Sequence, residues 1–168
     1  MPVKRLNHAV LYVRDAQKSA TFYEEVLGFR RVHDLGTAVF MQAPASTNDH
    51  DLGLFGVGAA AGASGAGRAT VGLYHLAWEV DTLDELERLS GALAERGALV
   101  GASDHGTTKA LYAHDPDGLE FEVSWLVPAD QLHLVEGDGV TTTPLDLTAE
   151  KARFGATTEG GIGVSSRA

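Results

Sequence analysis

Two histidines and one glutamate, far apart in the 168-residue chain, are the residue types that can bind a transition-metal ion together. His8, His75 and Glu122 each stand in a short β-like run. Two imidazoles and one carboxylate can hold divalent iron or manganese on one face and leave the opposite positions open to substrate and oxygen. If the three side chains converge, the sequence predicts a metalloenzyme.

The composition excludes several other classes of protein and of metal site. The chain has no cysteine, which excludes disulfides and thiolate–metal sites. Its 13 Lys and Arg against 23 Asp and Glu give a formal net charge of −10, which repels phosphate backbones and anionic lipid surfaces. We therefore expect no nucleic-acid partner and no membrane partner. The start of the chain has no apolar signal core and no run is long enough to cross a bilayer, so we expect a cytoplasmic protein.

The first part of the chain predicts a strand, a helix and three further strands. A strand is expected over Val3–Val13, with His8 in its middle. Asp15 can cap a helix that runs through Val26 and stops at Gly28. Turn residues separate the strands expected near 29–32, 37–42 and 51–57.

A Gly-, Ala- and Ser-rich linker at 58–70 precedes a second stretch with the same order of elements. A strand over 73–80 carries His75 near its start, and Asp81 or Thr82 can cap the amphipathic helix that follows. The remaining strands are expected near 98–102, 109–113 and 119–126.

The two stretches match in register as well as in order. Gly28 and Gly97 end the two predicted helices, and they lie 20 and 22 residues after His8 and His75. A duplicated βαβββ unit is the economical explanation. The sequence thus predicts an α+β domain over 1–127, in which tandem repeats at 3–57 and 71–127 form a cupped, barrel-like mixed sheet with the helices outside.

Strand alternation predicts which side chains face the inside of the cup. On the last strand Glu120, Glu122 and Ser124 share one face, and apolar residues share the other. On the neighbouring strand Tyr112 and His114 share a parity. A polar concave face is typical of a binding site rather than of a core.

Four segments carry a resemblance to a known family: Leu6–Val13, Phe22–Phe29, Tyr74–Val80 and Tyr112–Glu122 with its Asp-Pro-Asp-Gly turn. Together they resemble the vicinal oxygen chelate superfamily, which groups glyoxalases, bleomycin- and fosfomycin-resistance proteins and extradiol ring-cleaving dioxygenases. The likeness covers residues 3–127. It implies that His8, His75 and Glu122 bind the metal.

The strand that begins near residue 51 separates the activities within that superfamily. Glyoxalases of the superfamily have a fourth metal ligand there, usually a carboxylate, whereas this strand reads His50-Asp51-Leu52-Gly53-Leu54-Phe55 with its carboxylate only at the edge. The string resembles the strand of extradiol dioxygenases that begins with a catalytic histidine. The resemblance implies a dioxygenase with Fe(II), or alternatively Mn(II), in which His50 moves protons for a catechol-like substrate.

Two further residues take their roles from the same resemblance. Tyr112 matches a tyrosine that hydrogen-bonds the substrate oxygen, at a position where fosfomycin-type transferases also carry a tyrosine. His105 resembles a substrate-side histidine of some extradiol enzymes and takes a supporting catalytic role. The partners implied are a small aromatic substrate and dioxygen, and we expect a homodimer.

Two other functions remain open for the same fold. A glyoxalase-type isomerase or a fosfomycin-type transferase would use the same three ligands with the metal as a Lewis acid, and would not need His50. A non-catalytic drug-binding resistance protein would use the cup as an apolar trap.

Residues 128–168 form a C-terminal tail in this interpretation, partly docked or flexible. Their Gly-, Ser- and Thr-rich composition contributes little core. Within the tail Thr148 can cap a short helical turn from Ala149 to Phe154, which Gly155 ends, and its apolar side chains could dock on the body.

Overall fold

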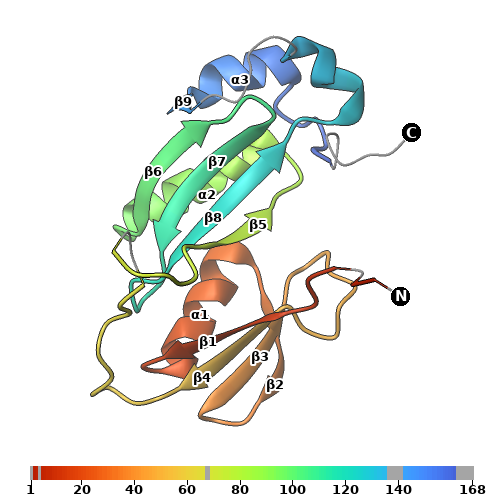
Figure 1. Ribbon diagram of the computed structural model, residues 1–168. Coiled ribbons are helices and arrows are strands. Elements are labelled where there is room, and N and C mark those ends of the chain that lie inside the picture. Colours follow the sequence, from red (N-terminus) through yellow and green to blue (C-terminus); the bar gives the residue numbers. More distant parts are fainter. Residues whose placement is uncertain (1, 4, 67–68, 136–141, 162–168) are drawn as a thin grey trace. The chain divides into compact units, whose positions relative to one another are not determined.

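The computed structural model describes residues 2–3, 5–66, 69–135 and 142–161. Residues 67–68 of the expected linker, and 136–141 and 162–168 of the expected tail, lie outside the described residues. The chain divides into two compact units, which are described separately: unit 1 is Met1–Gly65 with Asp115–Leu119, and unit 2 is Ala66–His114 with Glu120–Ala168 (Figure 1). No helix in the described part is both long and apolar enough to span a membrane.

Unit 1 has the predicted order of one strand, one helix and three strands. Its strands form a four-stranded sheet in the order β1-β4-β3-β2, in which β1 runs parallel to β4 and the other pairs are antiparallel. In chain order the elements are β1 (Ala9–Val13), α1 (Ala16–Leu27), β2 (Arg30–Asp34), β3 (Ala38–Gln42) and β4 (Leu52–Gly56).

Both ends of helix α1 are those that the sequence predicts. The Asp15 carboxylate accepts hydrogen bonds from the backbone N–H groups of Gln17 and Lys18, at 2.9 and 3.1 Å. Gly28 ends the helix with a φ of 72°, a left-handed conformation that costs glycine little. The buried stripe of the helix covers one face of the sheet and includes Ala16, Ala20, Tyr23 and Val26.

Unit 2 repeats this order and then adds a C-terminal extension. Its strands form a five-stranded sheet in the order β5-β8-β7-β6-β9, with β5 parallel to β8. The repeat consists of β5 (Leu76–Glu79), α2 (Leu83–Glu95), β6 (Leu99–Asp104), β7 (Thr108–His114) and β8 (Glu120–Leu126). The extension consists of the 3-10 helix η1 (Ala129–Leu134), β9 (Thr143–Pro144) and α3 (Leu147–Phe154).

The α+β class and the duplicated βαβββ unit are therefore confirmed. In the described residues the strands make two separate sheets, each with its own helix, rather than one continuous barrel-like sheet. Of the two caps proposed for α2, Thr82 is the one observed, because its side chain accepts the backbone N–H of Glu85 at 3.2 Å.

Both strands predicted to contain a metal-binding histidine are shorter than expected. β1 begins at Ala9 and β5 at Leu76, so His8 and His75 each precede a strand instead of lying inside one. In β1 the pairing explains the difference, because Ala9 pairs with Leu52, the first residue of β4. A strand extends only as far as its partner offers hydrogen bonds.

The C-terminal extension docks on unit 2. Strand β9 pairs with the outer edge of β6, with Thr143 opposite Asp104. Helix α3 is capped by Asp146, whose side chain accepts the N–H of Ala149 at 3.0 Å, so the expected cap Thr148 was wrong. Thr148 already lies in the first helical turn, where its hydroxyl cannot take the capping position.

Candidate metal and catalytic site

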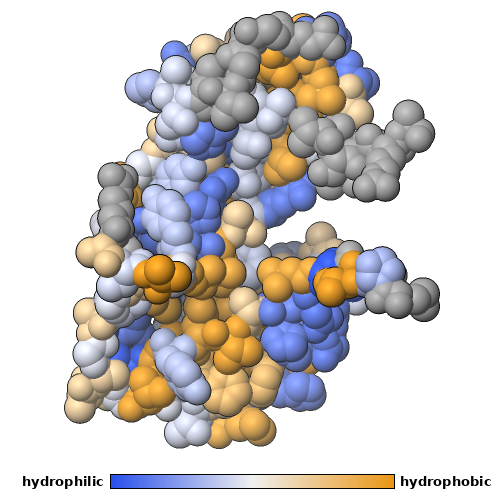
Figure 2. Space-filling model, viewed as in Figure 1, coloured by the Kyte–Doolittle hydropathy of each residue, from blue (hydrophilic) through white to orange (hydrophobic). Residues whose placement is uncertain are grey.

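One face of the sheet of unit 1 packs on α1, and the other face is open and aromatic. On the open face Val10 and Tyr12 are 50% and 76% exposed. The rings of Phe40 and Phe55 stand edge to face beside each other, with their centroids 5.8 Å apart. Figure 2 shows hydrophobic residues gathered over β1, β3 and β4. The open face of unit 1 can therefore accept an apolar ring.

His8 and His50 meet at one end of this sheet. Each histidine lies just before a strand, and the parallel pairing of β1 with β4 brings the starts of these two strands together. The two imidazole centroids are 4.4 Å apart, and His50 also stands edge-on to Phe40 at 5.1 Å. Unit 1 thus places the predicted ligand His8 against the predicted catalytic residue His50.

Both imidazoles are oriented by an oxygen of the preceding residue. His8 Nδ1 lies 2.7 Å from Asn7 Oδ1, and His50 Nδ1 lies 3.1 Å from Asp49 Oδ2. Because these oxygens accept hydrogen bonds, Nδ1 carries the proton and the Nε2 lone pair of a neutral imidazole stays available. The backbone N–H of His50 lowers the pKa of Asp49, which keeps that carboxyl ionised as an acceptor. The two Nε2 atoms are suited to metal binding and to proton transfer.

Asn7, Asp49 and Phe40 are functional candidates that the sequence reasoning missed. A signal was present for the first two, because each directly precedes a predicted site histidine and carries an acceptor oxygen. Phe40 had no comparable signal, because an aromatic residue in a strand is ordinarily explained by packing.

The open face of the sheet of unit 2 is polar, as its strand alternation predicts. Glu122 on β8 stands opposite Tyr112 on β7, and Phe121 and Val123 point to the buried face. His75 Nε2 lies 3.2 Å from Glu122 Oε2. Unit 2 therefore brings together two of the three predicted ligands.

The separation of these two atoms fits a shared metal ion. Two ligand atoms bound to one transition metal at about 2.1 Å each lie roughly 3 Å apart. The Nδ1 atom of His75 is buried without a hydrogen-bond partner in the described residues, and the nearest oxygen of Glu120 is 3.9 Å away.

The predicted trio divides between the units, because His8 belongs to unit 1 and His75 and Glu122 belong to unit 2. In the described ranges neither unit alone holds three or more His, Asp or Glu side chains arranged for a metal ion. The convergence of the trio therefore stays a prediction.

Tyr112 and His105 form a hydrogen-bonded extension of the pair in unit 2. Tyr112 Oη lies 2.8 Å from His105 Nε2, and Tyr112 pairs across the strands with Glu122. Burial, followed by the charge of Glu122, raises the pKa of Tyr112 to about 12. Tyr112 is therefore a neutral phenol near neutral pH and can donate one hydrogen bond.

Asp51, the carboxylate at the edge of β4, accepts hydrogen bonds from the loop that precedes the strand. Its oxygens accept hydrogen bonds from Ala43 N at 2.9 Å, Ser46 Oγ at 2.7 Å and Asn48 Nδ2 at 2.7 Å. These contacts hold the loop between β3 and β4, which carries His50. The Asp51 carboxylate is therefore a structural group of this loop.

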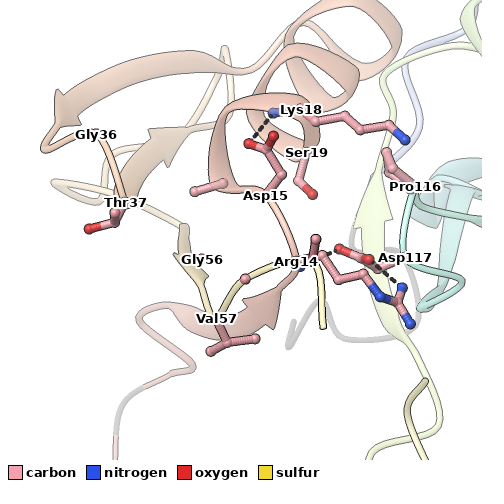
Figure 3. A pocket seen from close by; sticks show the side chains of 13 residues that line it. Arg14, Asp15, Lys18, Ser19, Gly36, Thr37, Gly56, Val57, Pro116 and Asp117 are labelled. Carbon is pink, nitrogen blue, oxygen red and sulfur yellow. Dashed lines mark hydrogen bonds and ion pairs between the residues drawn. The ribbon is translucent and has the colours of Figure 1, made fainter. Parts of the chain in front are cut away.

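A hollow of about 630 Å³ in unit 1 is lined by other residues (Figure 3). Three of its four charged side chains are engaged within the chain: Arg14 Nη1 lies 2.6 Å from Asp117 Oδ1, and Asp15 caps α1. The Ser19 hydroxyl points toward the hollow but is buried beneath its surface. None of the six predicted site residues lines this hollow. We therefore assign the candidate site to the residues around His8 and His50 in unit 1 and around His75 and Glu122 in unit 2.

Comparisons with known proteins identify the family of the chain. The model of the Glyoxalase/Bleomycin resistance protein/Dioxygenase superfamily matches residues 5–123. Biphenyl-2,3-diol 1,2-dioxygenase 3 of Rhodococcus globerulus is 30% identical over 142 residues, which cover 82% of this chain and 73% of that protein.

Two further relatives are also named as dioxygenases. Catechol-2,3-dioxygenase of Bacillus subtilis (strain 168) is 29% identical over 70% of this chain and 40% of its own length. A manganese-dependent 2,3-dihydroxybiphenyl 1,2-dioxygenase of Geobacillus genomosp. 3 is 24% identical over 72% of this chain and 36% of its own length. The chain thus spans less than half of these two relatives.

Solved structures share the fold at lower sequence identity. A glyoxylase/bleomycin resistance protein/dioxygenase domain from Frankia sp. EAN1pec has a TM-score of 0.60 at 22% identity, over 79% of this chain and 99% of that one. The fosfomycin resistance protein FosX from Listeria monocytogenes has a TM-score of 0.55 at 15% identity, over 73% and 93%.

Proposed function

Since the chain belongs to the glyoxalase/bleomycin resistance protein/dioxygenase superfamily, we propose that it is a metal-dependent extradiol dioxygenase of a catechol-like aromatic. In this reaction one ring C–C bond beside the two hydroxylated carbons breaks, and both atoms of dioxygen enter the product. The ring supplies the four electrons that reduce dioxygen. In this proposal His8, His75 and Glu122 hold Fe(II) or Mn(II), and relatives named as dioxygenases support it.

The observation that carries the proposal is the pair of imidazoles in unit 1. The ring centroid of His50 lies 4.4 Å from that of the proposed ligand His8. The Nε2 atom of His50 has no hydrogen-bond partner among the described residues. A Lewis-acid enzyme needs only the ligand histidine at this position, whereas ring cleavage also needs a group that removes and returns protons. The second histidine therefore favours the dioxygenase.

Several side chains have separate roles in the proposed reaction. A bound Fe(II) or Mn(II) would supply the path for electrons between the aromatic ring and dioxygen. His50 accepts a proton from a substrate hydroxyl at Nε2 and returns it as the product forms. Tyr112 donates a hydrogen bond to a substrate oxygen. Phe40 and Phe55 pack against the ring and exclude water from it.

The rival activities of the same fold have weaker support in this chain. A four-ligand glyoxalase site would need a carboxylate near the start of β4, and Asp51 there makes three hydrogen bonds within its own loop. An isomerase or transferase with three ligands leaves His50 without a task. Likeness to a fosfomycin resistance protein at 15% identity concerns the fold.

The proposal is tested with two histidine variants. The full chain is reconstituted anaerobically with Fe(II) or Mn(II), a panel of catechols is added, and oxygen uptake and ring-opened product are recorded. We expect His50→Ala to keep its metal and to lose turnover by about 10²- to 10⁴-fold, the usual contribution of a general acid–base group. His75→Ala should lose the metal itself, measured by elemental analysis after gel filtration.

His133→Ala is the matched control, because this exposed histidine on η1 lies outside the proposed site. It should keep both metal and turnover. Full turnover in His50→Ala would remove His50 from the mechanism and favour a Lewis-acid enzyme. Metal-loaded protein that opens no catechol of the panel would refute the dioxygenase.

A further inference from the structure

The two histidines of unit 1 lie outside the hydrogen-bond ladder that joins β1 to β4. The ladder starts where Ala9 N donates to the carbonyl of Asp51 at 2.9 Å, and Ala9 pairs with Leu52. His8 and His50 both precede this point. The spacing of their rings therefore depends on the contacts that hold the two segments in front of the strands.

The side-chain amide of Asn48 connects these two segments. Its Nδ2 atom lies 2.7 Å from the backbone carbonyl oxygen of Asn7, 41 residues away, and 2.7 Å from Asp51 Oδ1. Asn7 directly precedes His8, and Asp51 directly follows His50. One amide group thus bonds to a neighbour of each histidine.

The orientation of the Asn48 amide follows from its partners. A backbone carbonyl only accepts, so the group that faces Asn7 must be the NH₂ group with its two protons. This orientation leaves Asn48 Oδ1 buried without a hydrogen-bond partner in the described residues. A buried acceptor without a partner costs stability. The side chain is therefore arranged to make the two donated hydrogen bonds at the expense of its own oxygen.

Asn7 transmits the connection to the ring of His8. Its backbone carbonyl accepts from Asn48, and its side-chain Oδ1 lies 2.7 Å from His8 Nδ1. On the other side, the Asp51 carboxylate accepts two further hydrogen bonds from the loop that carries His50. Both imidazoles are thereby connected to one amide group.

We propose that Asn48 is a positioning residue: its amide sets the spacing of the His8 and His50 rings by bonding the residue next to each. The ring centroids are 4.4 Å apart. This spacing places a proposed metal ligand beside the group that moves the substrate proton, and acid–base catalysis depends on such placement. The effect on turnover rests on the proposed function, whereas the ring spacing does not.

The test compares Asn48→Ala with a matched control in the same unit. Gln17→Ala also removes an amide that donates to one carboxylate and one backbone carbonyl, because Gln17 Nε2 lies 2.8 Å from Asp34 Oδ1 and 2.9 Å from Gly36 O. These contacts lie where β3 begins, at the opposite end of the sheet from the two histidines. The control therefore removes the same kind of hydrogen bonds away from the site.

Two further variants complete the set. Asn48→Asp keeps the shape of the side chain, but an ionised carboxylate has no proton for either contact. Thr47→Ala removes a second contact between the two segments, the hydrogen bond from Arg5 Nη1 to Thr47 Oγ1. That bond is exposed and 3.4 Å long, so its loss should leave the ring spacing unchanged.

The ring spacing is measured in the metal-free full chain as the nuclear Overhauser effect between the ring protons of His8 and His50, with His8→Gln and His50→Gln to assign the signals. We expect a strong effect in the natural chain, Gln17→Ala and Thr47→Ala, and the loss of most of it in both Asn48 variants. With metal and a catechol, kcat of Asn48→Ala should fall roughly tenfold, the worth of one buried hydrogen bond, with less change in KM.

An unchanged Overhauser effect in both Asn48 variants, or its absence in the natural chain, would overturn the inference whatever the activity of the protein. The same loss in Gln17→Ala would also overturn it, because the rings would then respond to any loosening of unit 1. Unfolding of both Asn48 variants, read from their backbone amide spectra, would show a role in stability alone and likewise overturn it. If no variant opens catechols but the ring spacing responds as expected, the proposed function fails and the positioning role of Asn48 stands.

Discussion

Asp115 is a buried carboxylate of unit 1 whose two oxygens are unequally satisfied. Oδ1 accepts the backbone N–H groups of Asp117 and Leu119 at 2.8 and 2.9 Å, and Oδ2 is buried without a hydrogen-bond partner in the described residues. Burial raises the pKa of Asp115 above its ordinary value. Burial also raises the pKa of Tyr23, with a second contribution from the charge of Asp115. The carboxyl therefore shapes the turn, as the sequence predicts. Its ionised form lowers the free energy of unfolding, because a buried charge is poorly solvated.

This cost predicts a pH dependence of stability. Because the pKa is higher in the folded chain, the folded state binds more protons, and the free energy of unfolding falls as the pH rises through the folded pKa. Asp115→Asn keeps an acceptor for the turn and removes the charge, so its stability relative to the natural chain should increase with pH. Urea unfolding at several pH values measures this difference. Equal pH profiles in both proteins, or the same change in exposed Asp130→Asn, would contradict the assignment.

At the scale of elements, the docking of α3 depends on a buried ion network rather than on apolar area alone. Lys109 lies on the buried face of β7 between carboxylates of β6 and α3. These two carboxylates compensate the burial of the Lys109 ammonium group. Helix α3 and strand β6 therefore stabilise each other through their shared contact with Lys109.

Removing Lys109 should be far more costly than removing a partly exposed lysine of the same region. Lys109→Met leaves two carboxylates close together without a cation and should lower the free energy of unfolding by about 3–5 kcal/mol. Lys151→Met is the control, because Lys151 pairs with Asp84 and Glu87 at the surface and should cost much less. Similar urea midpoints for the two variants would show that the buried network does not hold α3.

Elements defined by local chemistry are those that the sequence predicted best. Asp15 and Gly28 define α1 through contacts within a few residues, so both ends were predicted correctly. The ends of β1 and β5 depend on partner strands far along the chain, and there the expectations were too long. The buried charge of Lys109 was also missed, since its partner Glu150 is remote in sequence.

The candidate site was likewise predicted from the sequence only where local patterns determine it. The parity of Glu122 predicted a polar face, which the structure confirms. The pairing of His8 with His50 follows from parallel strands that no local pattern shows, and their roles came from family resemblance. Asn48 carries no signal of its own, because only the pairing of β1 with β4 brings it to Asn7.

For the whole molecule, the net charge of −10 bears on the choice of ligands. A negative field attracts a divalent cation and opposes an anionic substrate. An uncharged catechol is therefore the appropriate first substrate. The proposed ligands belong to both units, so metal binding would require the whole domain rather than either repeat.

The most direct measurement of the proposed function is the stoichiometry of oxygen uptake. The anaerobic full chain receives Fe(II) or Mn(II) and an uncharged catechol, and an oxygen electrode and absorbance then follow oxygen and ring-opened product together. The expected result is one dioxygen consumed for each ring opened, only with metal present and without release of peroxide. Metal-loaded protein that consumes no oxygen, or that releases peroxide while the ring stays closed, would contradict the dioxygenase assignment.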